Sequence, residues 1–166
     1  MAIIKVGFSK SRKSLPIVSL LIRLIERTKF SHAYVKFPVK RWELDLIYQA
    51  TGSGVGFSGP KAFEHDHEVV EEYEIEVSDE AKDRILKWCA ERAGQKYSKK
   101  EICGFLIKRL ANVFGIKMAN PFKDEGYVCT ELASEIMTLC GYEAPENLND
   151  MGLVETREMV LRIVKK

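Results

Sequence analysis

The sequence predicts a single α+β domain that spans residues 1–166. Four segments alternate between apolar and polar residues, as half-buried strands do: residues 2–8, 31–37, 44–50 and 68–77. Five other segments space their apolar residues as helices do: residues 15–27, 79–92, 98–114, 129–140 and 155–164. A chain of 166 residues buries about 70% of its unfolded surface in one core.

The composition is that of an ordinary globular protein, with 46% apolar and 30% charged residues. A net charge of +2 gives no overall field that would favour nucleic acid or a membrane as partner. We find no apolar run long enough to span a bilayer, and the N-terminus is too short and too β-like for a signal peptide. The four cysteines lack paired spacing, so we expect reduced thiols and a cytoplasmic location.

Strands 31–37 and 44–50 are separated by only six residues and predict an antiparallel hairpin. If Phe37 pairs with Leu44, one face of the hairpin is wholly apolar and faces the core. The same register then places His32 directly opposite Gln49 on the other face, close enough for a side-chain hydrogen bond.

Residues 51–60 are rich in glycine, but no lysine follows at the spacing of a phosphate-binding loop. We expect a flexible connection there. His65, Asp66 and His67 offer ligands for a metal, but no cysteine lies at zinc-finger spacing, so a solvated cluster is the better interpretation. The sequence predicts no metal and no other cofactor. Cys89 and Cys103 fall within apolar helical patterns, which predicts burial for both.

Cys129 begins a helical pattern that continues to about Cys140 and is ended by Gly141. A thiol in the first turn of a helix lies near unpaired N–H groups and the positive end of the helix dipole. Both lower its pKa and favour the nucleophilic thiolate. The alternative is a structural cysteine, because Cys129 lies in line with the apolar face of the helix.

Cysteine catalysis needs a thiol, an imidazole within reach and a group that orients the imidazole. Cys129, His32 and Gln49 supply these three types, with the base almost 100 positions before the nucleophile. His32 is the one histidine on a predicted strand, since the other two lie in the polar run at 65–67.

Three motifs resemble the circularly permuted papain-like amidases of the NlpC-type superfamily of cysteine hydrolases, which are related to lecithin:retinol acyltransferase-like enzymes. They are Phe-Ser-His-Ala-Tyr-Val at 30–35, Ile-Tyr-Gln-Ala at 47–50 and Tyr-Val-Cys-Thr-Glu-Leu at 127–132. In that family the histidine strand comes first and the nucleophile helix last. The resemblance implies a permuted papain-like fold, in which an antiparallel sheet packs against helices and the nucleophile begins a helix.

The resemblance implies that Cys129 is the nucleophile, His32 the base and Gln49 the third polar residue. Close relatives often have glutamate at this third position, so a glutamine implies a weaker base. The backbone N–H of Cys129 would bind the oxyanion. Tyr127 would add its hydroxyl there or line the substrate groove, and strand packing is the alternative role for it.

Three classes of function follow from this site. The first is a hydrolase that cleaves an amide, of peptide or isopeptide type, through an acyl-enzyme. The second is a lipid acyltransferase or deacylase with the same cysteine and histidine, acting on an acyl substrate. The third is a catalytically inert module that binds a partner or serves as a virion structural part.

Overall fold

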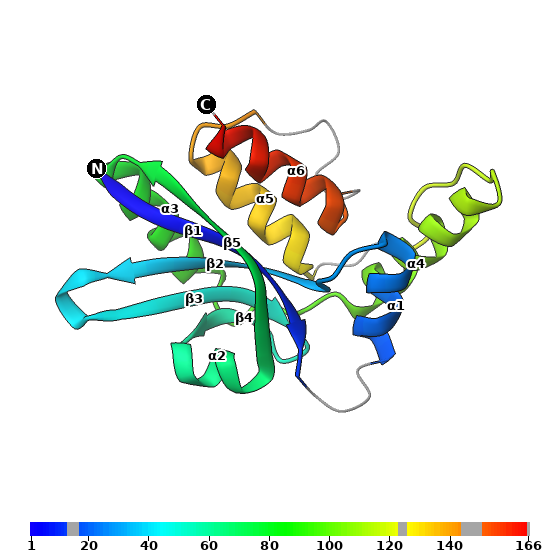
Figure 1. Ribbon diagram of the computed structural model, residues 1–166, viewed down its shortest axis with the longest axis horizontal. Coiled ribbons are helices and arrows are strands. Elements are labelled where there is room, and N and C mark those ends of the chain that lie inside the picture. Colours follow the sequence, from blue (N-terminus) through cyan, green and yellow to red (C-terminus); the bar gives the residue numbers. More distant parts are fainter. Residues whose placement is uncertain (13–16, 123–125, 144–150, 166) are drawn as a thin grey trace.

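The computed structural model describes residues 1–12, 17–122, 126–143 and 151–165. It confirms the α+β class. Five strands form one antiparallel sheet in the order β4-β3-β2-β1-β5 (Figure 1). Their bounds are Ala2–Ser11 for β1, His32–Val39 for β2, Leu44–Thr51 for β3, Gly54–Ser58 for β4 and His67–Val77 for β5.

Strand β1 lies inside the sheet because it pairs with β2 on one side and β5 on the other. Its side chains Ile4, Val6 and Phe8 are fully buried. Gly7 is required next to β2, since a Cβ there would lie 2.1 Å from the ring of Tyr34. The ladder to β5 shifts between Phe8 and Ser9, a bulge close to the start of β2.

The predicted hairpin of β2 and β3 forms, but its register is wrong by two residues. Phe37 pairs with Leu46, and Val39, instead of Phe37, pairs with Leu44. Strand β2 continues through Val39 because the turn is made by a short 3-10 segment, Lys40–Trp42, and by Glu43, whose φ is 51°. A slip of two residues leaves every side chain on its predicted face, because the side-chain period of a strand is two.

The glycine-rich segment expected as a flexible connection instead forms the edge strand β4. It pairs antiparallel with β3, and Val55 is buried in the core. The period-two signal was hidden because glycine occupies the alternate positions 54 and 56.

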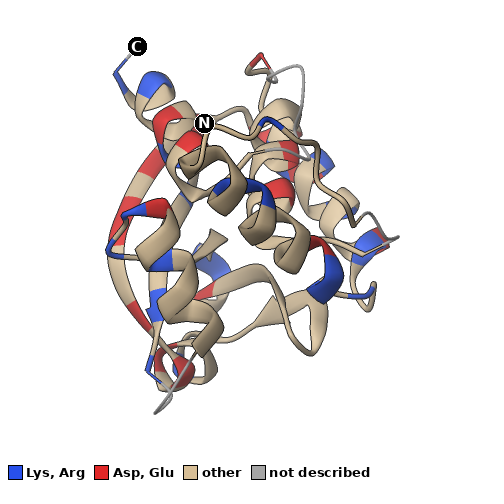
Figure 2. Ribbon diagram, turned by 90° about the vertical axis from the view of Figure 1, so that its right-hand side faces the viewer, with Lys and Arg blue, Asp and Glu red and all other residues tan. Residues whose placement is uncertain are grey.

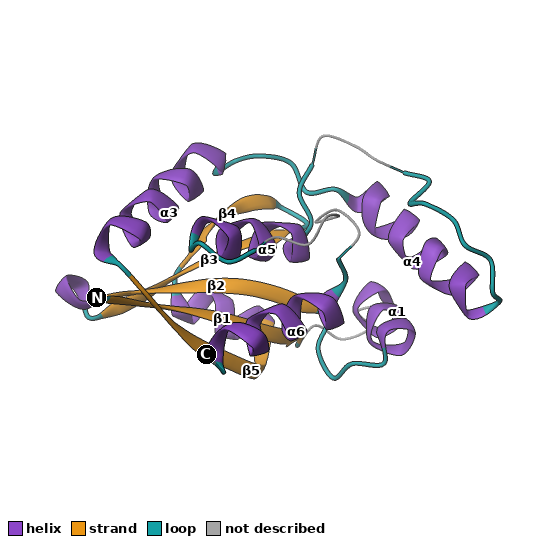
Figure 3. Ribbon diagram, turned by 90° about the horizontal axis from the view of Figure 1, so that it is seen from above, coloured by secondary structure: helices purple, strands orange, loops and turns teal. Residues whose placement is uncertain are grey.

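Helices cover the two faces of the sheet unequally (Figures 1 and 3). Helices α3 (Asp79–Arg92), α5 (Cys129–Leu139) and α6 (Leu153–Val164) lie over one face and enclose the main core. The short helix α2 (Pro60–Asp66) lies over the other, where Phe63 packs with Tyr34 and Ile47.

Helices α1 (Ile17–Glu26) and α4 (Lys99–Val113) lie next to each other at one end of the molecule (Figures 1 and 3). The expected start of the first helix, at residues 15 and 16, lies outside the described residues. Cys89 on α3 is buried as predicted, but Cys103 on α4 is exposed, because its side of α4 faces away from the core. Within the described part of the chain, no helix is long and apolar enough to cross a bilayer.

Candidate active site

His32 and Gln49 meet at the ends of β2 and β3, where both side chains are buried. His32 Nε2 and Gln49 Oε1 are 2.8 Å apart. The orientation of the amide follows from its other end, because Gln49 Nε2 donates to Ser58 Oγ at 3.1 Å and the Ser58 hydroxyl donates to the carbonyl of Ile47. Gln49 Oε1 therefore accepts, His32 Nε2 carries the proton, and Nδ1 keeps a free lone pair.

Two aromatic side chains fix the plane of the His32 ring. His67, at the start of β5, stacks on His32 with ring centroids 4.8 Å apart, and Phe63 of α2 stacks on His67 at 4.9 Å. His67 Nδ1 also lies 3.3 Å from the Ser9 hydroxyl, next to the bulge of β1. The sequence placed His67 in a polar cluster, and its contact with His32 could not be read from that pattern.

The buried surroundings keep His32 uncharged. Burial and, to a smaller extent, the charge of His67 lower its pKa from 6.5 to about 3, against the opposing effect of the hydrogen bond to Gln49. Gln49 has no negative charge that could stabilise an imidazolium. The resting base is therefore a neutral imidazole, the form that can accept a proton.

Cys129 is the first residue of α5, and Val128 precedes it in extended conformation. The first hydrogen bond of this helix runs from the N–H of Leu132 to the carbonyl of Val128, so the earlier N–H groups lack helical partners. The N–H groups of Ala33, Thr130 and Cys129 itself favour the thiolate, yet burial outweighs them and raises the thiol pKa above its ordinary value. The lowered pKa expected from the helix terminus alone is therefore wrong for this resting state.

Helix α5 packs on β2 and brings Cys129 to the start of that strand. The N–H of Ala33, the residue after His32, is directed at the Cys129 sulfur. Among the described contacts, no hydrogen bond joins this sulfur to the imidazole of His32. The structure thus pairs His32 with Gln49 and brings the Cys129 sulfur to the backbone of Ala33, the residue after His32.

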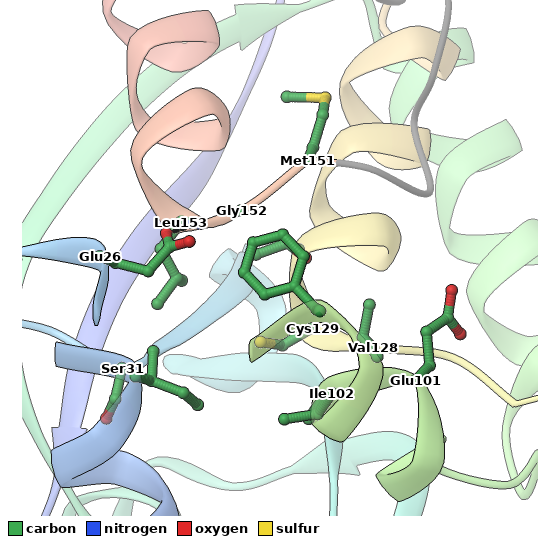
Figure 4. A pocket seen from close by; sticks show the side chains of 12 residues that line it. Glu26, Ser31, Glu101, Ile102, Val128, Cys129, Met151, Gly152 and Leu153 are labelled. Atoms are coloured by element: carbon green, nitrogen blue, oxygen red, sulfur yellow. Dashed lines mark hydrogen bonds between the residues drawn. The ribbon is translucent and has the colours of Figure 1, made fainter. Parts of the chain in front are cut away.

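Two neighbouring cavities share this region. One, of about 40 Å³, contains Cys129, and the other, of about 370 Å³, contains His32. Ile22 of α1 and Ser31 line both cavities. Figure 4 shows the Cys129 sulfur directed into the smaller cavity, which Ser31 and Ile102 also line. The small volume leaves room for little more than water beside the thiol.

Tyr97 is a site residue that the sequence did not indicate. It lines the cavity of His32, and burial raises the pKa of its phenol, as does negative charge on Cys129. A parallel bridge between Tyr97 and Tyr127 holds it beside the start of α5. Tyr97 lies in the break between two helices, so no periodic pattern marked it.

Tyr127 faces another part of the molecule. Its hydroxyl accepts a hydrogen bond from Arg92 Nε of α3 at 3.1 Å, and its ring contacts Trp88 edge-on. These contacts favour the packing role that the sequence left open for Tyr127. Glu131 lies in the first turn of α5, where the dipole favours a carboxylate.

Glu26, at the end of α1, connects α1 to the start of α6 through hydrogen bonds. Its carboxylate accepts hydrogen bonds from the N–H groups of Leu153, at 2.8 Å, and Val154, at 3.3 Å, and it pairs with Arg109 of α4. The negative charge of Glu26 also raises the pKa of the Cys129 thiol. Over the described residues, no group of three His, Cys, Asp or Glu side chains is arranged to hold a metal ion.

No protein-family model matches this chain, and no curated protein matches it. Membership of the permuted papain-like family is therefore a proposal from the three motifs and the site geometry.

Proposed function

We propose that this protein is a cysteine hydrolase of the permuted papain-like type, which cleaves an amide bond through an acyl-enzyme on Cys129. The observation that carries the proposal is the buried, hydrogen-bonded pair of His32 and Gln49, together with a cysteine at the start of a helix whose sulfur meets the N–H of Ala33, the residue after His32. A histidine whose Nε2–H is fixed by an amide oxygen presents Nδ1 as the base, which is the division of roles that nucleophilic cysteine catalysis uses.

In the first half of the reaction, the Cys129 sulfur attacks the substrate carbonyl carbon while His32 Nδ1 takes the thiol proton. A C–S bond forms, and the carbonyl oxygen becomes an oxyanion. When the oxyanion collapses, the C–N bond breaks and the imidazolium returns its proton to the leaving amine. This sequence starts from a neutral thiol and a neutral imidazole, the forms that the pKa shifts of Cys129 and His32 favour.

In the second half, water attacks the thioester with His32 again as the base. The C–S bond breaks, the acid is released and the proton returns to the thiol. An amine or a lysophospholipid in place of water would make the same site an acyltransferase. Gln49 holds the ring but adds no charge, so we expect proton transfer to be weaker than with a carboxylate at this position.

The oxyanion would lie between two donors. The backbone N–H of Cys129 belongs to the first turn of α5, and Tyr97, which lines the neighbouring cavity, would supply the second through its hydroxyl. Substrate must enlarge the cavity around Cys129 and bring the sulfur to Nδ1. Such contacts are commonly loose without substrate and tighten when it binds.

The order of the site residues along the chain also supports the permuted type. His32 and Gln49 come from adjacent strands of the first half, and Cys129 starts a helix of the second half that packs on β2. A catalytically inert module that binds a partner has no need for the fixed tautomer of His32, which makes this alternative weaker.

The test is acylation of the intact chain by a p-nitrophenyl acyl ester, followed by mass spectrometry and peptide mapping. We expect one acyl group on Cys129, loss of this adduct in Cys129→Ala, and strongly slowed acylation in His32→Ala. Release of p-nitrophenol beyond one equivalent would report turnover.

The matched control is Cys103→Ser, which removes the exposed thiol of α4. We expect this variant to be acylated as the wild type is. Acylation confined to Cys103, or a rate at Cys129 that does not depend on His32, would contradict the proposed function.

A further inference from the structure

The end of the molecule formed by α1 and α4 exposes a concentration of apolar side chains. Of the eighteen large apolar side chains that are exposed in the described chain, eleven lie on α1, on α4 or on residues 114–122. Monomeric proteins expose contiguous apolar patches of this kind mainly at interaction sites. We call this end, residues 17–29 and 98–122, the α1–α4 surface.

Helix α1 contributes half of its residues to this surface. Ile17, Val18, Leu20, Leu21 and Leu24 are all large, apolar and at least 42% exposed. A helix on the surface of a soluble protein normally presents polar side chains to the solvent. The outward face of α1 is apolar and therefore suits a non-aqueous neighbour.

The end of α4 and the residues that follow it continue the surface. Val113, Phe114 and Ile116 are exposed by 68%, 74% and 59%. Helices α1 and α4 pack against each other (Figures 1 and 3), so the two sets of side chains belong to one end of the molecule.

The charges on the α1–α4 surface have one sign. Its two segments contain eight Lys or Arg residues and only two acidic residues, Glu26 and Glu101, both of which are buried. Figure 2 views the molecule from this end. The net charge of +2 for the whole chain concealed this separation, because acidic residues predominate elsewhere.

We propose that the α1–α4 surface docks on an anionic lipid bilayer. Exposed apolar side chains on helices flanked by Lys and Arg are the features of interfacial helices, which bury apolar side chains at the acyl boundary and place cations among anionic headgroups. A second copy of the chain fits less well, since a twofold contact would bring two basic surfaces together.

The docked orientation places the candidate site beside the lipid. Ile22 of α1 and Ile102 and Phe105 of α4 line the cavity of Cys129, so the helices that bind the bilayer also form its wall. A substrate held at the bilayer would then reach the thiol between these helices. This last step depends on the proposed function, whereas docking itself does not depend on the thiol.

The test is sedimentation of the full chain with vesicles of phosphatidylcholine, with and without phosphatidylglycerol. We expect strong binding to the anionic vesicles, weak binding to the neutral ones, and release by added salt. Cys129→Ala should bind as the wild type does, which separates a failure of docking from a failure of catalysis.

Two variants remove apolar contacts from the surface: Leu20→Ser with Leu24→Ser, and Val113→Ser with Phe114→Ser. We expect each to bind anionic vesicles about tenfold or more weakly, because each removes two side chains that would enter the acyl boundary. The matched control is Trp42→Ser, which removes an apolar side chain that is 60% exposed in the turn between β2 and β3 (Figure 1). It should bind normally.

Lys99→Glu with Lys117→Glu tests the electrostatic part, with exposed Lys87→Glu of α3 as its control. We expect a loss on the order of fivefold for each surface charge removed and little change in the control. Melting temperatures of all variants should stay near that of the wild type, since the replaced side chains are exposed. If one of these variants does not fold, the test uses Phe114→Trp in the wild-type background instead. The tryptophan emission of that protein should shift to the blue when anionic vesicles are added.

Absence of binding to anionic vesicles would overturn the proposal, as would an equal loss in the Trp42→Ser control. A dimer in sedimentation velocity that Leu20→Ser with Leu24→Ser dissociates would assign the surface to a second copy and would also overturn it.

Discussion

Gln49 hydrogen-bonds His32 although the two residues are not opposed in the β2–β3 ladder. The ladder pairs Val35 with Tyr48, which places Gln49 opposite Tyr34, so its side chain reaches His32 along the diagonal at 2.8 Å. Diagonal neighbours on one face of a sheet are within reach of long side chains. The contact therefore depends on the length of glutamine and on the Ser58 hydroxyl that orients its amide.

The Nε2–H tautomer of His32 should be lost when the hydrogen bonds that fix it are removed. In Ser58→Ala the Gln49 amide is free to turn its NH₂ toward the ring, which would move the imidazole proton to Nδ1. In Gln49→Leu the ring has no acceptor at all, and we expect acylation to slow by about 100-fold or more. Nitrogen NMR of the imidazole reports the tautomer directly.

The control for this prediction is Ser53→Ala, which removes a hydroxyl that hydrogen-bonds Thr51 at an exposed turn. It should change neither the tautomer nor the rate. An unchanged Nε2–H tautomer in both Ser58→Ala and Gln49→Leu would show that the hydrogen bond does not set the state of the ring.

Tyr97→Phe should separate a role in the oxyanion site from a role in packing. If the hydroxyl stabilises the oxyanion, its loss lowers the acylation rate by about 10²-fold with the fold intact. Tyr127→Phe is the matched variant, since it removes a hydroxyl that is bound to Arg92. We expect it to cost about 1 kcal/mol of stability and to leave the rate unchanged. Equal rates in the two variants would exclude Tyr97 from the oxyanion site.

Protonation of His32 should destabilise the protein in acid. Its pKa is about 3 in the folded chain and near 6.5 when exposed, so between these values the unfolded chain binds the proton and the folded chain does not. The contribution of neutral His32 to the free energy of unfolding is therefore fully present above pH 6.5. It is lost as the pH falls toward 3, by up to about 1.4 kcal/mol per pH unit. Melting temperatures across this range should fall more steeply for the wild type than for His32→Gln.

The difference between these two proteins isolates His32 from other groups. Burial raises the pKa of Glu26, which acts in the opposite direction, because that carboxyl binds its proton more readily when folded. This contribution is common to both proteins. His65→Gln, at an exposed site, is the control and should keep the wild-type slope. Parallel curves for wild type and His32→Gln would mean that the imidazole is solvated.

The sequence predicted which face of the sheet each side chain lies on better than it predicted which residues pair across β2 and β3. His32 and Gln49 were placed on one face because the period-two pattern survives a slip of two residues. The register itself depended on the left-handed conformation of Glu43, which allowed Val39 to remain in the strand, and glutamate carries little signal for that conformation.

The state of the Cys129 thiol depends on distant segments. A local pattern shows the helix start, which favours the thiolate. It does not show that Ile22, Ile102 and Met151, far apart in the chain, close around the sulfur and raise its pKa. Tyr97 was missed for the same reason, since only its bridge to Tyr127 brings it to the site.

Gly126 should be essential for this bridge, because the chain passes very close to residues 96–98 there. A Cβ at Gly126 would lie 2.8 Å from the Ser98 nitrogen and 3.0 Å from the Lys96 oxygen. The same backbone carries the hydrogen bonds that join Tyr127 to Lys96 and to Ser98. Gly126→Ala must therefore push the two segments apart, at a cost of about 1–3 kcal/mol.

The displacement would also move Tyr97 away from the start of α5, so acylation of Cys129 should slow along with the loss of stability. Gly56→Ala is the matched control, since a Cβ there meets no atom within 4 Å and its φ is not in the left-handed region. Alanine at Gly56 should leave stability equal or slightly higher, because it restricts the unfolded chain. Chemical denaturation of both variants measures the difference, and equal stabilities would show that the two segments are not in contact at Gly126.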